Sequence, residues 1–171
     1  KSSVIIANKN TKIAKSIGSL ISTSYYNIEY SKDVRGVEIC SAIKNIYSTI
    51  IGAGEGLNTS SSIFRKSISE MVYLTKFFKG KEDTVYGLAG IGDLYVSALG
   101  GRNSRMGEYL GKGFTFKKAK NKFMPNDTIE GAQLAFEIAP YMLKKINNKK
   151  IPLMVDLLKA ISKNKKLNIR W

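Results

Sequence analysis

The hydrophobic pattern of the chain changes near residue 33, and this change limits the folds that are open to it. Residues 3–7 (SVIIA) and 26–30 (YNIEY) are short apolar runs typical of strands, and residues 11–22 between them show helical spacing. Two strands do not form a stable sheet alone. We therefore expect residues 1–32 either to dock on the remainder of the chain or to be the end of a larger sheet.

From residue 33 onward the apolar residues have helical spacing. Isoleucines over 39–50 form one stripe that stops in the glycines of 52–56. A second helix is predicted to start at a cap formed by Asn58 or Thr59 and to end at Gly80. Shorter helices are expected from about Leu94 and about Asn103.

Two further helices are predicted near the C-terminus. Asp127 is expected to cap a helix that runs to residue 147 with an interruption at Pro140, and Pro152 suits the first position of the last helix. Asp127 and Glu130 have the spacing of a capping box, which favours a structural role for both. The predicted fold is mainly α: a helical body over 33–171 behind a strand-helix-strand piece.

The absence of histidine excludes several chemistries. With no His and one Cys among 171 residues, the chain has no Ser-His-Asp or Cys-His pair and no His-ligated metal, so we expect no metal site. Cys40 cannot form an internal disulfide, which indicates a reducing, cytoplasmic setting. No leader segment and no membrane span are predicted, because no apolar stretch is long enough to cross a bilayer.

A formal net charge of +15 indicates an anionic partner, such as nucleic acid, acidic lipid or a phosphorylated small molecule. The charge is uneven, since residues 112–171 hold 14 of the 28 basic side chains and 4 of the 13 acidic ones. A solvated lysine-rich face is favoured over a dedicated polyanion site, because runs of this kind usually form solvated surfaces. Aromatic residues do not alternate with these lysines, which argues against a site that stacks single-stranded nucleic acid. A basic helical nucleic-acid-binding module remains an alternative, although no recognition-helix pair is evident.

Lys44 is the first candidate for chemistry. Its neighbours one turn away are Cys40, Ser41, Tyr47 and Ser48, so no carboxylate on its own helix can pair with it. The side chain therefore either extends to water beside the core stripe, which spacing alone favours, or stands in a pocket. In a pocket its amine could serve as a general base.

The glycine-rich segment 87–103 is the second candidate. Glycines before Asp93 and before Arg102 would let backbone N–H groups approach an anion, and Arg102 with Asn103 could grip a phosphate. The alternative is that Asp93 only caps a helix and the glycines only form turns. Neither this segment nor GAGEG at 52–56 has the GxGxxG spacing of a dinucleotide-binding turn.

Four ordered motifs carry a family resemblance. Residues 33–45 (DVRGVEICSAIKN), 84–94 (TVYGLAGIGDL), 100–103 (GGRN) and 129–131 (IEG) closely resemble the NAD(P)-dependent glycerol-3-phosphate dehydrogenases. The similarity spans nearly the whole chain. It implies hydride transfer between sn-glycerol 3-phosphate and NAD or NADP, giving dihydroxyacetone phosphate.

The resemblance also implies residue roles. Lys44 matches the family's proton acceptor, and Asp93 is the second catalytic residue. The positions that match substrate-binding residues are Lys44, Asn45, Asp93, Ser97, Arg102 and Asn103. Arg102 and Glu130 match positions that touch the cofactor.

The same resemblance implies a domain organisation. Residues 1–32 correspond to the end of a dinucleotide-binding domain, and 33–171 to a helical substrate domain of the 6-phosphogluconate-dehydrogenase C-terminal type. The family's glycine-rich nucleotide-binding sequence is not in this chain, so we expect a fragment that is inactive in isolation. The partner is a small phosphorylated substrate, and a homodimer is compatible with the family. The alternatives are a truncated non-catalytic relative and a dehydrogenase for another acid substrate.

Overall fold

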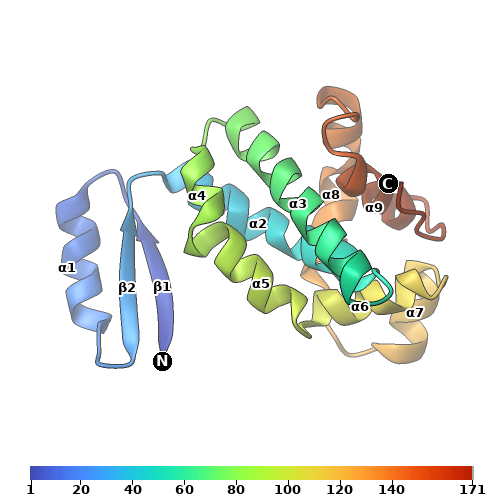
Figure 1. Ribbon diagram of the computed structural model, residues 1–171, viewed down its shortest axis with the longest axis horizontal. Helices are drawn as coiled ribbons and strands as arrows, with labels where there is room; N and C mark the ends of the chain where they lie inside the picture. Colours follow the sequence, from blue (N-terminus) through green and yellow to red (C-terminus); the bar gives the residue numbers. More distant parts are fainter. Residues whose placement is uncertain (171) are drawn as a thin grey trace.

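The structure is a computed structural model that describes residues 1–170, and its N-terminal unit lies at one end of a helical body (Figure 1). In this unit β1 (Ser2–Ala7) and β2 (Tyr26–Ser31) pair in parallel, with Val4 opposite Ile28. They are joined by α1 (Thr11–Ile21), whose first turn is capped by the side chain of Asn10. Ala14 and Gly18 are the buried residues of α1. The order of strand, helix and strand confirms the prediction for this segment.

The rest of the described chain is helical, which confirms the predicted mainly α architecture. Its elements are α2 (Val34–Gly52), α3 (Leu57–Phe77), α4 (Glu82–Tyr86), the π-helix η1 (Leu88–Gly92), α5 (Asp93–Ala98), α6 (Arg102–Gly111), α7 (Phe116–Phe123), α8 (Glu130–Lys145) and α9 (Pro152–Ser162). Over the described residues, no helix is both long enough and apolar enough to cross a membrane.

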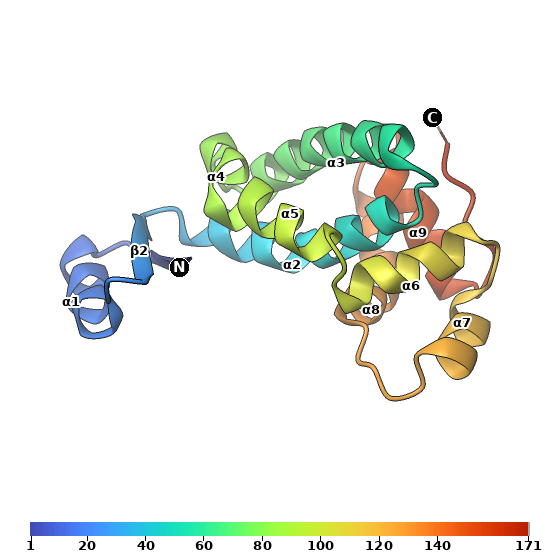
Figure 2. The ribbon, with the colours of Figure 1, turned by 60° about the horizontal axis from the view of Figure 1, so that its bottom comes forward.

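Helix α2 runs through the middle of the helical body (Figures 1 and 2) and contacts α3, α5, α6, α8 and α9. Glycines allow its backbone to approach α6 closely. A Cβ atom added at Gly107 would lie 2.0 Å from the carbonyl oxygen of Thr49, and one at Gly52 would lie 2.1 Å from the carbonyl oxygen of Ser104. Larger residues at these contacts would therefore force the two helices apart.

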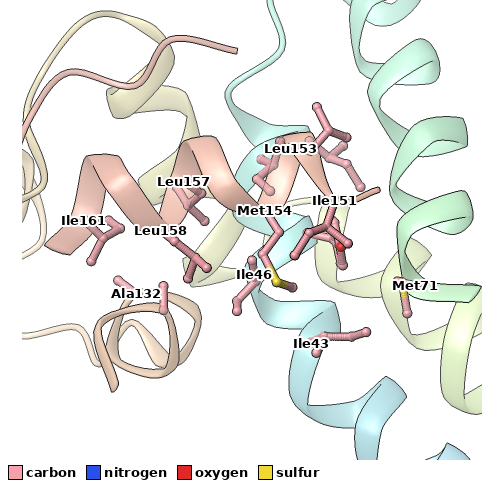
Figure 3. Close-up of a cluster of buried hydrophobic side chains, with 14 of the residues drawn as sticks. Ile43, Ile46, Met71, Ala132, Ile151, Leu153, Met154, Leu157, Leu158 and Ile161 are labelled. Atoms are coloured by element: carbon pink, nitrogen blue, oxygen red, sulfur yellow. The ribbon is translucent and has the colours of Figure 1, made fainter. Parts of the chain in front are cut away.

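The apolar core lies between α2 and α9. Figure 3 shows Met154 and Leu158 of α9 facing Ile46 of α2, with Leu153 and Leu157 on the same helix. All five side chains are fully buried. Because each is worth about 1.5–3 kcal/mol of burial, this contact is a large part of what holds the C-terminal helices on α2.

Glu70 is a buried carboxylate within this apolar region. Its oxygens accept hydrogen bonds from the backbone N–H groups of Leu153 (2.7 Å) and Met154 (3.1 Å) and from the Tyr47 hydroxyl (3.0 Å). It thus caps the first turn of α9 from α3, because the residue before that helix, Ile151, offers no side-chain acceptor. Burial raises the pKa of Glu70 to about 7, although these three hydrogen bonds act in the opposite direction.

Asp33 fixes the junction between the N-terminal unit and α2. One carboxylate oxygen caps α2 at Gly36 N (3.0 Å), and the other accepts bonds from Lys81 N (2.7 Å) and the Thr84 hydroxyl (2.6 Å). Burial alone would raise the pKa of Asp33, but the hydrogen bonds and the charge of Lys81 lower it overall. The start of α2 is therefore tied to α4.

Three predictions about helix ends are wrong. Helix α3 starts after Gly56, whose φ of 81° lies in the left-handed region, and neither Asn58 nor Thr59 is its cap. Helix α8 starts at Glu130, and the residue before it, Ile129, makes no side-chain cap, so Asp127 and Glu130 form no capping box. Pro140 lies inside α8 without interrupting it. Proline has no N–H, so the carbonyl oxygen of Phe136, one turn earlier, lacks its usual donor. Both residues are exposed, so water can donate to this oxygen instead.

Glu70 should dominate the pH dependence of stability near neutrality, since the chain has no histidine. Its folded-state pKa of about 7 lies above the ordinary value of 4.5, so the folded protein holds the proton more tightly than the unfolded chain. The free energy of unfolding should therefore fall by up to about 3 kcal/mol as the pH rises from about 5 to about 8. Urea unfolding at several pH values measures this slope.

The matched control is Glu70→Gln, which cannot ionise. Its unfolding free energy should be nearly constant across the same pH range, whatever its absolute value. A slope as steep as that of the unmodified chain would show that another group is responsible.

Candidate active site

Lys44 of α2 and Asp93 of α5 form an ion pair across two helices. The Nζ atom of Lys44 donates a hydrogen bond to Oδ2 of Asp93, a residue 49 positions away in the sequence. The Lys44 side chain is 20% exposed, so it does not extend into solvent as spacing alone favours. The carboxylate that pairs with this amine therefore comes from another helix.

The segment before Asp93 does not form an anion cradle. It is the π-helix η1, in which the N–H groups of Gly90 and Gly92 both bond to the carbonyl oxygen of Gly87. A Cβ atom at Gly90 would lie 2.0 Å from the carbonyl oxygen of Val85, so this glycine is required for packing against α4. The prediction that these glycines offer N–H groups to a phosphate is wrong, and Asp93 makes no side-chain cap for α5.

Arg102 and Asn103 open α6 and meet the start of α8. Arg102 Nη2 donates to Glu130 Oε1 at 2.5 Å, and Asn103 Nδ2 donates to Glu130 Oε2 at 3.4 Å. Asn103 Oδ1 accepts the N–H of Gly131 at 2.8 Å, so it satisfies a free donor in the first turn of α8. Asn103 is buried, whereas Arg102 is exposed and Glu130 is half-buried.

Helix α2 brings the Lys44–Asp93 pair and the Arg102–Asn103–Glu130 group to one region. Asn45 follows Lys44, and a Cβ atom at Gly131 would lie 2.3 Å from the Asn45 carbonyl oxygen. That oxygen also accepts bonds from the hydroxyls of Ser48 (3.1 Å) and Thr49 (2.9 Å). The helix carrying Lys44 is therefore in van der Waals contact with the one carrying Glu130.

Ser97 lies one turn after Asp93 on α5 and is half-buried. Within residues 1–170, no hydrogen bond or ion pair joins Ser97 to Lys44, Asp93 or Arg102. A groove of about 340 Å³ reaches Asp93 from the side of β1, and Ser41 and Val96 also line it. The carboxylate of Asp93 is thus accessible from the side of the N-terminal unit.

Sequence reasoning misses two contributors to this region. Gly131 enters it only as part of a motif, yet its lack of a side chain permits the contact between α2 and α8. Asp33 enters it only as the start of the helical spacing and of the first motif, yet it holds the N-terminus of α2. A glycine in the first turn of a helix is the available signal for the first, and an Asp before a helical run for the second.

A known protein family shares the sequence of the helical body. The sequence model of the family described as the NAD-dependent glycerol-3-phosphate dehydrogenase C-terminus matches residues 33–169. The chain belongs to this family. The resemblance drawn from the four motifs is thereby confirmed.

Individual relatives agree with this assignment. The chain is 32% identical over 155 residues to an NADP(+)-dependent glycerol-3-phosphate dehydrogenase of Archaeoglobus fulgidus, covering 84% of this chain and 46% of the relative. It is 30% identical over 168 residues to a glycerol-3-phosphate dehydrogenase [NAD(P)+] of Halothermothrix orenii, covering 95% and 49%. The crystal structure of glycerol-3-phosphate dehydrogenase from Coxiella burnetii superposes with a TM-score of 0.85 at 26% identity, covering 96% and 51%.

The chain spans about half the length of the known relatives that it matches. The other half of each relative has no counterpart among these 171 residues.

Gly131→Ala should damage the site without touching a charged group. The added methyl group would press on the Asn45 carbonyl oxygen (2.3 Å) and on Asn103 Oδ1 (2.9 Å), so α8 must shift from α2 and α6. We expect a loss of about 1–3 kcal/mol in the free energy of unfolding, measured by urea denaturation. Gly87→Ala is the control, because its nearest neighbouring atom would be 3.6 Å away. Equal stability of the two variants would contradict the close α2–α8 contact.

Proposed function

We propose that this chain is the substrate-binding and catalytic helical part of a glycerol-3-phosphate dehydrogenase. In the complete enzyme, C2 of sn-glycerol 3-phosphate would be oxidised to the ketone of dihydroxyacetone phosphate, or the reverse. The observation that carries the proposal is the Lys44–Asp93 ion pair, in a chain that belongs to this family. The next residue, Asn45, contacts Gly131 of α8, which is bonded to Asn103 of the Arg102–Asn103–Glu130 group.

Lys44 is the proposed proton acceptor. In its neutral form the amine would take the proton of the C2 hydroxyl as the C2 hydride leaves, and in the reductive direction its ammonium would return that proton. Asp93 stabilises the ammonium that results and orients the Nζ atom, since it holds Lys44 by a direct hydrogen bond. Because the chain has no histidine, a lysine is one of the few side chains in it that can accept a proton near neutral pH.

Arg102 and Asn103 are the proposed phosphate ligands. They are the first two residues of α6, where backbone N–H groups point out of the helix and the dipole favours an anion. A guanidinium presents several donors in one plane, so Arg102 can keep its bond to Glu130 and still bind phosphate oxygens. Asn45 and Ser97 complete the proposed substrate contacts from α2 and α5.

Arg102 and Glu130 are the proposed contacts of this chain with the nicotinamide cofactor. The guanidinium suits the cofactor's phosphates and the carboxylate suits a ribose hydroxyl, and the pair lies on an accessible surface. When bound, NAD(P) supplies the hydride acceptor or donor. No GxGxxG turn is present in the chain, so the main cofactor-binding site would belong to a separate domain.

Residues 1–32 are proposed as the end of that nucleotide-binding domain, and 33–171 as the helical domain. The support is that α1 exposes a stripe of four apolar side chains next to a sheet of only two strands. These are Ile13, Ile17, Leu20 and Ile21. Further strands and a helix would cover this unit in the complete enzyme.

A cytoplasmic location and a homodimer belong to the same proposal. The single cysteine, Cys40, is buried and unpaired, which suits a reducing compartment. Exposed apolar side chains on α3 and α5, such as Leu57 and Tyr95, offer a surface suited to self-association.

Lys44→Met in the complete enzyme should lower kcat by about 100-fold to 10,000-fold, the usual worth of a positioned acid-base group. Steady-state kinetics with glycerol 3-phosphate and NAD(P) measures this, and circular dichroism checks that the fold survives. The control is Lys76→Met, which removes an exposed lysine paired with Glu82. A variant at position 44 that keeps most of its kcat would exclude Lys44 as the proton acceptor.

Arg102→Ala should act mainly on KM for glycerol 3-phosphate. Loss of charge-assisted hydrogen bonds worth about 1.5–3 kcal/mol corresponds to an increase of roughly 10-fold to 150-fold. Arg105→Ala is a matched control, because Arg105 is an exposed arginine on the same helix. The phosphate role fails if both variants keep the same KM.

A further inference from the structure

A cavity of about 830 Å³ lies between α7, the segment 125–129, α8 and the end of α9. We call it the α7–α9 cavity. Its floor is apolar, because Ile129, Ala132 and Ile161 line it and all three are buried. The rings of Phe116 on α7 and Phe136 on α8 add apolar walls. The volume is within the range of about 300–1,000 Å³ that small-molecule sites usually have.

Phe136 leaves a large apolar side chain in water at this cavity. It is 62% exposed, and within residues 1–170 no ring contact joins it to another aromatic side chain. Covering a phenylalanine ring removes apolar area from water, which is favourable. The cavity therefore suits a ligand with an apolar body.

Two lysines stand where α7 begins and α9 ends. The backbone N–H of Lys117, in the first turn of α7, donates to Oδ1 of Asn164 at 3.1 Å. This bond ties the start of α7 to the turn after α9, which also carries Lys163. Both lysines line the cavity and are exposed, and in the described part of the chain neither ammonium group has a hydrogen bond or an ion pair. Two cations are thus free to bind an anion.

The other charged residues of the lining belong to other parts of the wall. The Nζ atom of Lys120 donates to the carbonyl oxygens of Met124 (2.8 Å) and Pro125 (2.6 Å), so it holds the segment that closes the cavity. The acidic residues of the lining are Asp127, in this segment, and Glu137, on α8. Neither lies on the elements that carry the two free lysines, so an anionic group is favoured at the junction of α7 and α9.

The charge of the surrounding chain also favours an anion. Residues 112–171 hold 14 basic and 4 acidic side chains, and all of the residues that line the cavity belong to this stretch. Lys44 and Arg102 of the candidate active site lie outside it, so the proposed substrate site does not account for this surplus. A positive potential raises the local concentration of anions and their rate of association.

We propose that the α7–α9 cavity binds an amphipathic organic anion. Its apolar body would lie against Phe116 and Phe136, and its terminal carboxylate or phosphate would meet Lys117 and Lys163. A small hydrophilic anion would leave the apolar floor uncovered, and an uncharged apolar molecule would leave the two lysines without a partner. The floor and the lysines together therefore define the class of ligand.

This cavity is separate from the candidate active site. Ile129 lines the cavity, whereas the next residue, Glu130, bonds to Arg102 and is not among the lining residues. Figures 1 and 2 place α7 at the opposite end of the molecule from α1. The proposed nucleotide-binding domain would continue from the α1 end, so neither the substrate nor that domain accounts for the cavity.

Isothermal titration calorimetry of the chain with decanoate and with decyl phosphate, below the concentrations at which they form micelles, tests the proposal. We expect a saturable one-to-one complex with at least one of them, and the tighter of the two identifies the head group. Hexanoate, which is four methylene groups shorter than decanoate, should bind at least about 10-fold more weakly, since each buried methylene group is worth roughly 4-fold in affinity.

Decyltrimethylammonium tests the charge, because it has the same tail and a cationic head. It should bind at least about 10-fold more weakly than the decyl anions, since the two lysines repel it. Equal binding of this cation, or no saturable binding of either anion, would overturn the proposal.

A variant of the apolar wall locates the binding site. Phe136→Ser should weaken binding of the decyl anion at least about 10-fold, because it removes a ring that the tail covers. Phe136 is 62% exposed, so the variant should fold, which a thermal melt checks. The matched control is Tyr141→Ser, which removes a 50% exposed ring from the same helix outside the cavity lining. Unchanged affinity of Phe136→Ser would exclude the α7–α9 cavity as the site.

Variants of the lysines locate the anionic group. Lys117→Met and Lys163→Met should each weaken binding by about 2-fold to 5-fold, the usual worth of an exposed ion pair. Lys118→Met is the control, because Lys118 is an exposed lysine on α7 that does not line the cavity. Arg102→Ala should also leave binding unchanged. A loss of affinity in Arg102→Ala, with none in the two lysine variants, would place the anion in the candidate active site and refute the proposal.

These measurements use the chain itself and do not depend on turnover. They therefore stand or fall separately from the proposed dehydrogenase activity.

Discussion

The close approach of α2 to its neighbours is the constraint on which the rest of the structure depends. Glycines at the contacts with α6 and α8 bring helix backbones together where any side chain would collide, as at Gly107 and Gly131. Close-packed helices cannot slide without losing these contacts. As a result Lys44 of α2 is held against Asp93 of α5, and the next residue, Asn45, is held against Gly131 in the first turn of α8.

Two carboxylates complete this framework by binding backbone donors at helix ends. Asp33 caps α2 and reaches α4, and Glu70 reaches from α3 to cap α9 while holding Tyr47 of α2. Burying a carboxylate costs free energy. Three hydrogen bonds and the charge of Lys81 outweigh this cost at Asp33, whose pKa is lowered, whereas three hydrogen bonds offset it only in part at Glu70, whose pKa is raised to about 7. At these two points hydrogen bonds, and not apolar packing, fix the position of one helix against another.

The helical body buries its apolar side chains more completely than the N-terminal unit does. The body has a continuous core, whereas the two-stranded sheet and α1 leave apolar side chains exposed. The chain belongs to the C-terminal family of the NAD-dependent glycerol-3-phosphate dehydrogenases and covers about half of its relatives. Our proposal assigns the proton acceptor and the phosphate ligands to this helical half, and the main cofactor-binding site to a separate nucleotide-binding half.

The amino-acid sequence by itself determined the helical body, the strand-helix-strand unit and the family, because helical periodicity and short motifs are local properties of a chain. Residue types at motif positions also indicated Lys44, Asp93 and Arg102 as a group. Only the tertiary structure decided how they pair: Lys44 meets a carboxylate 49 residues away, and Glu130 meets Arg102 instead of forming a box with Asp127. Such pairings depend on how closely separate helices pack, and periodicity along one helix does not report that distance.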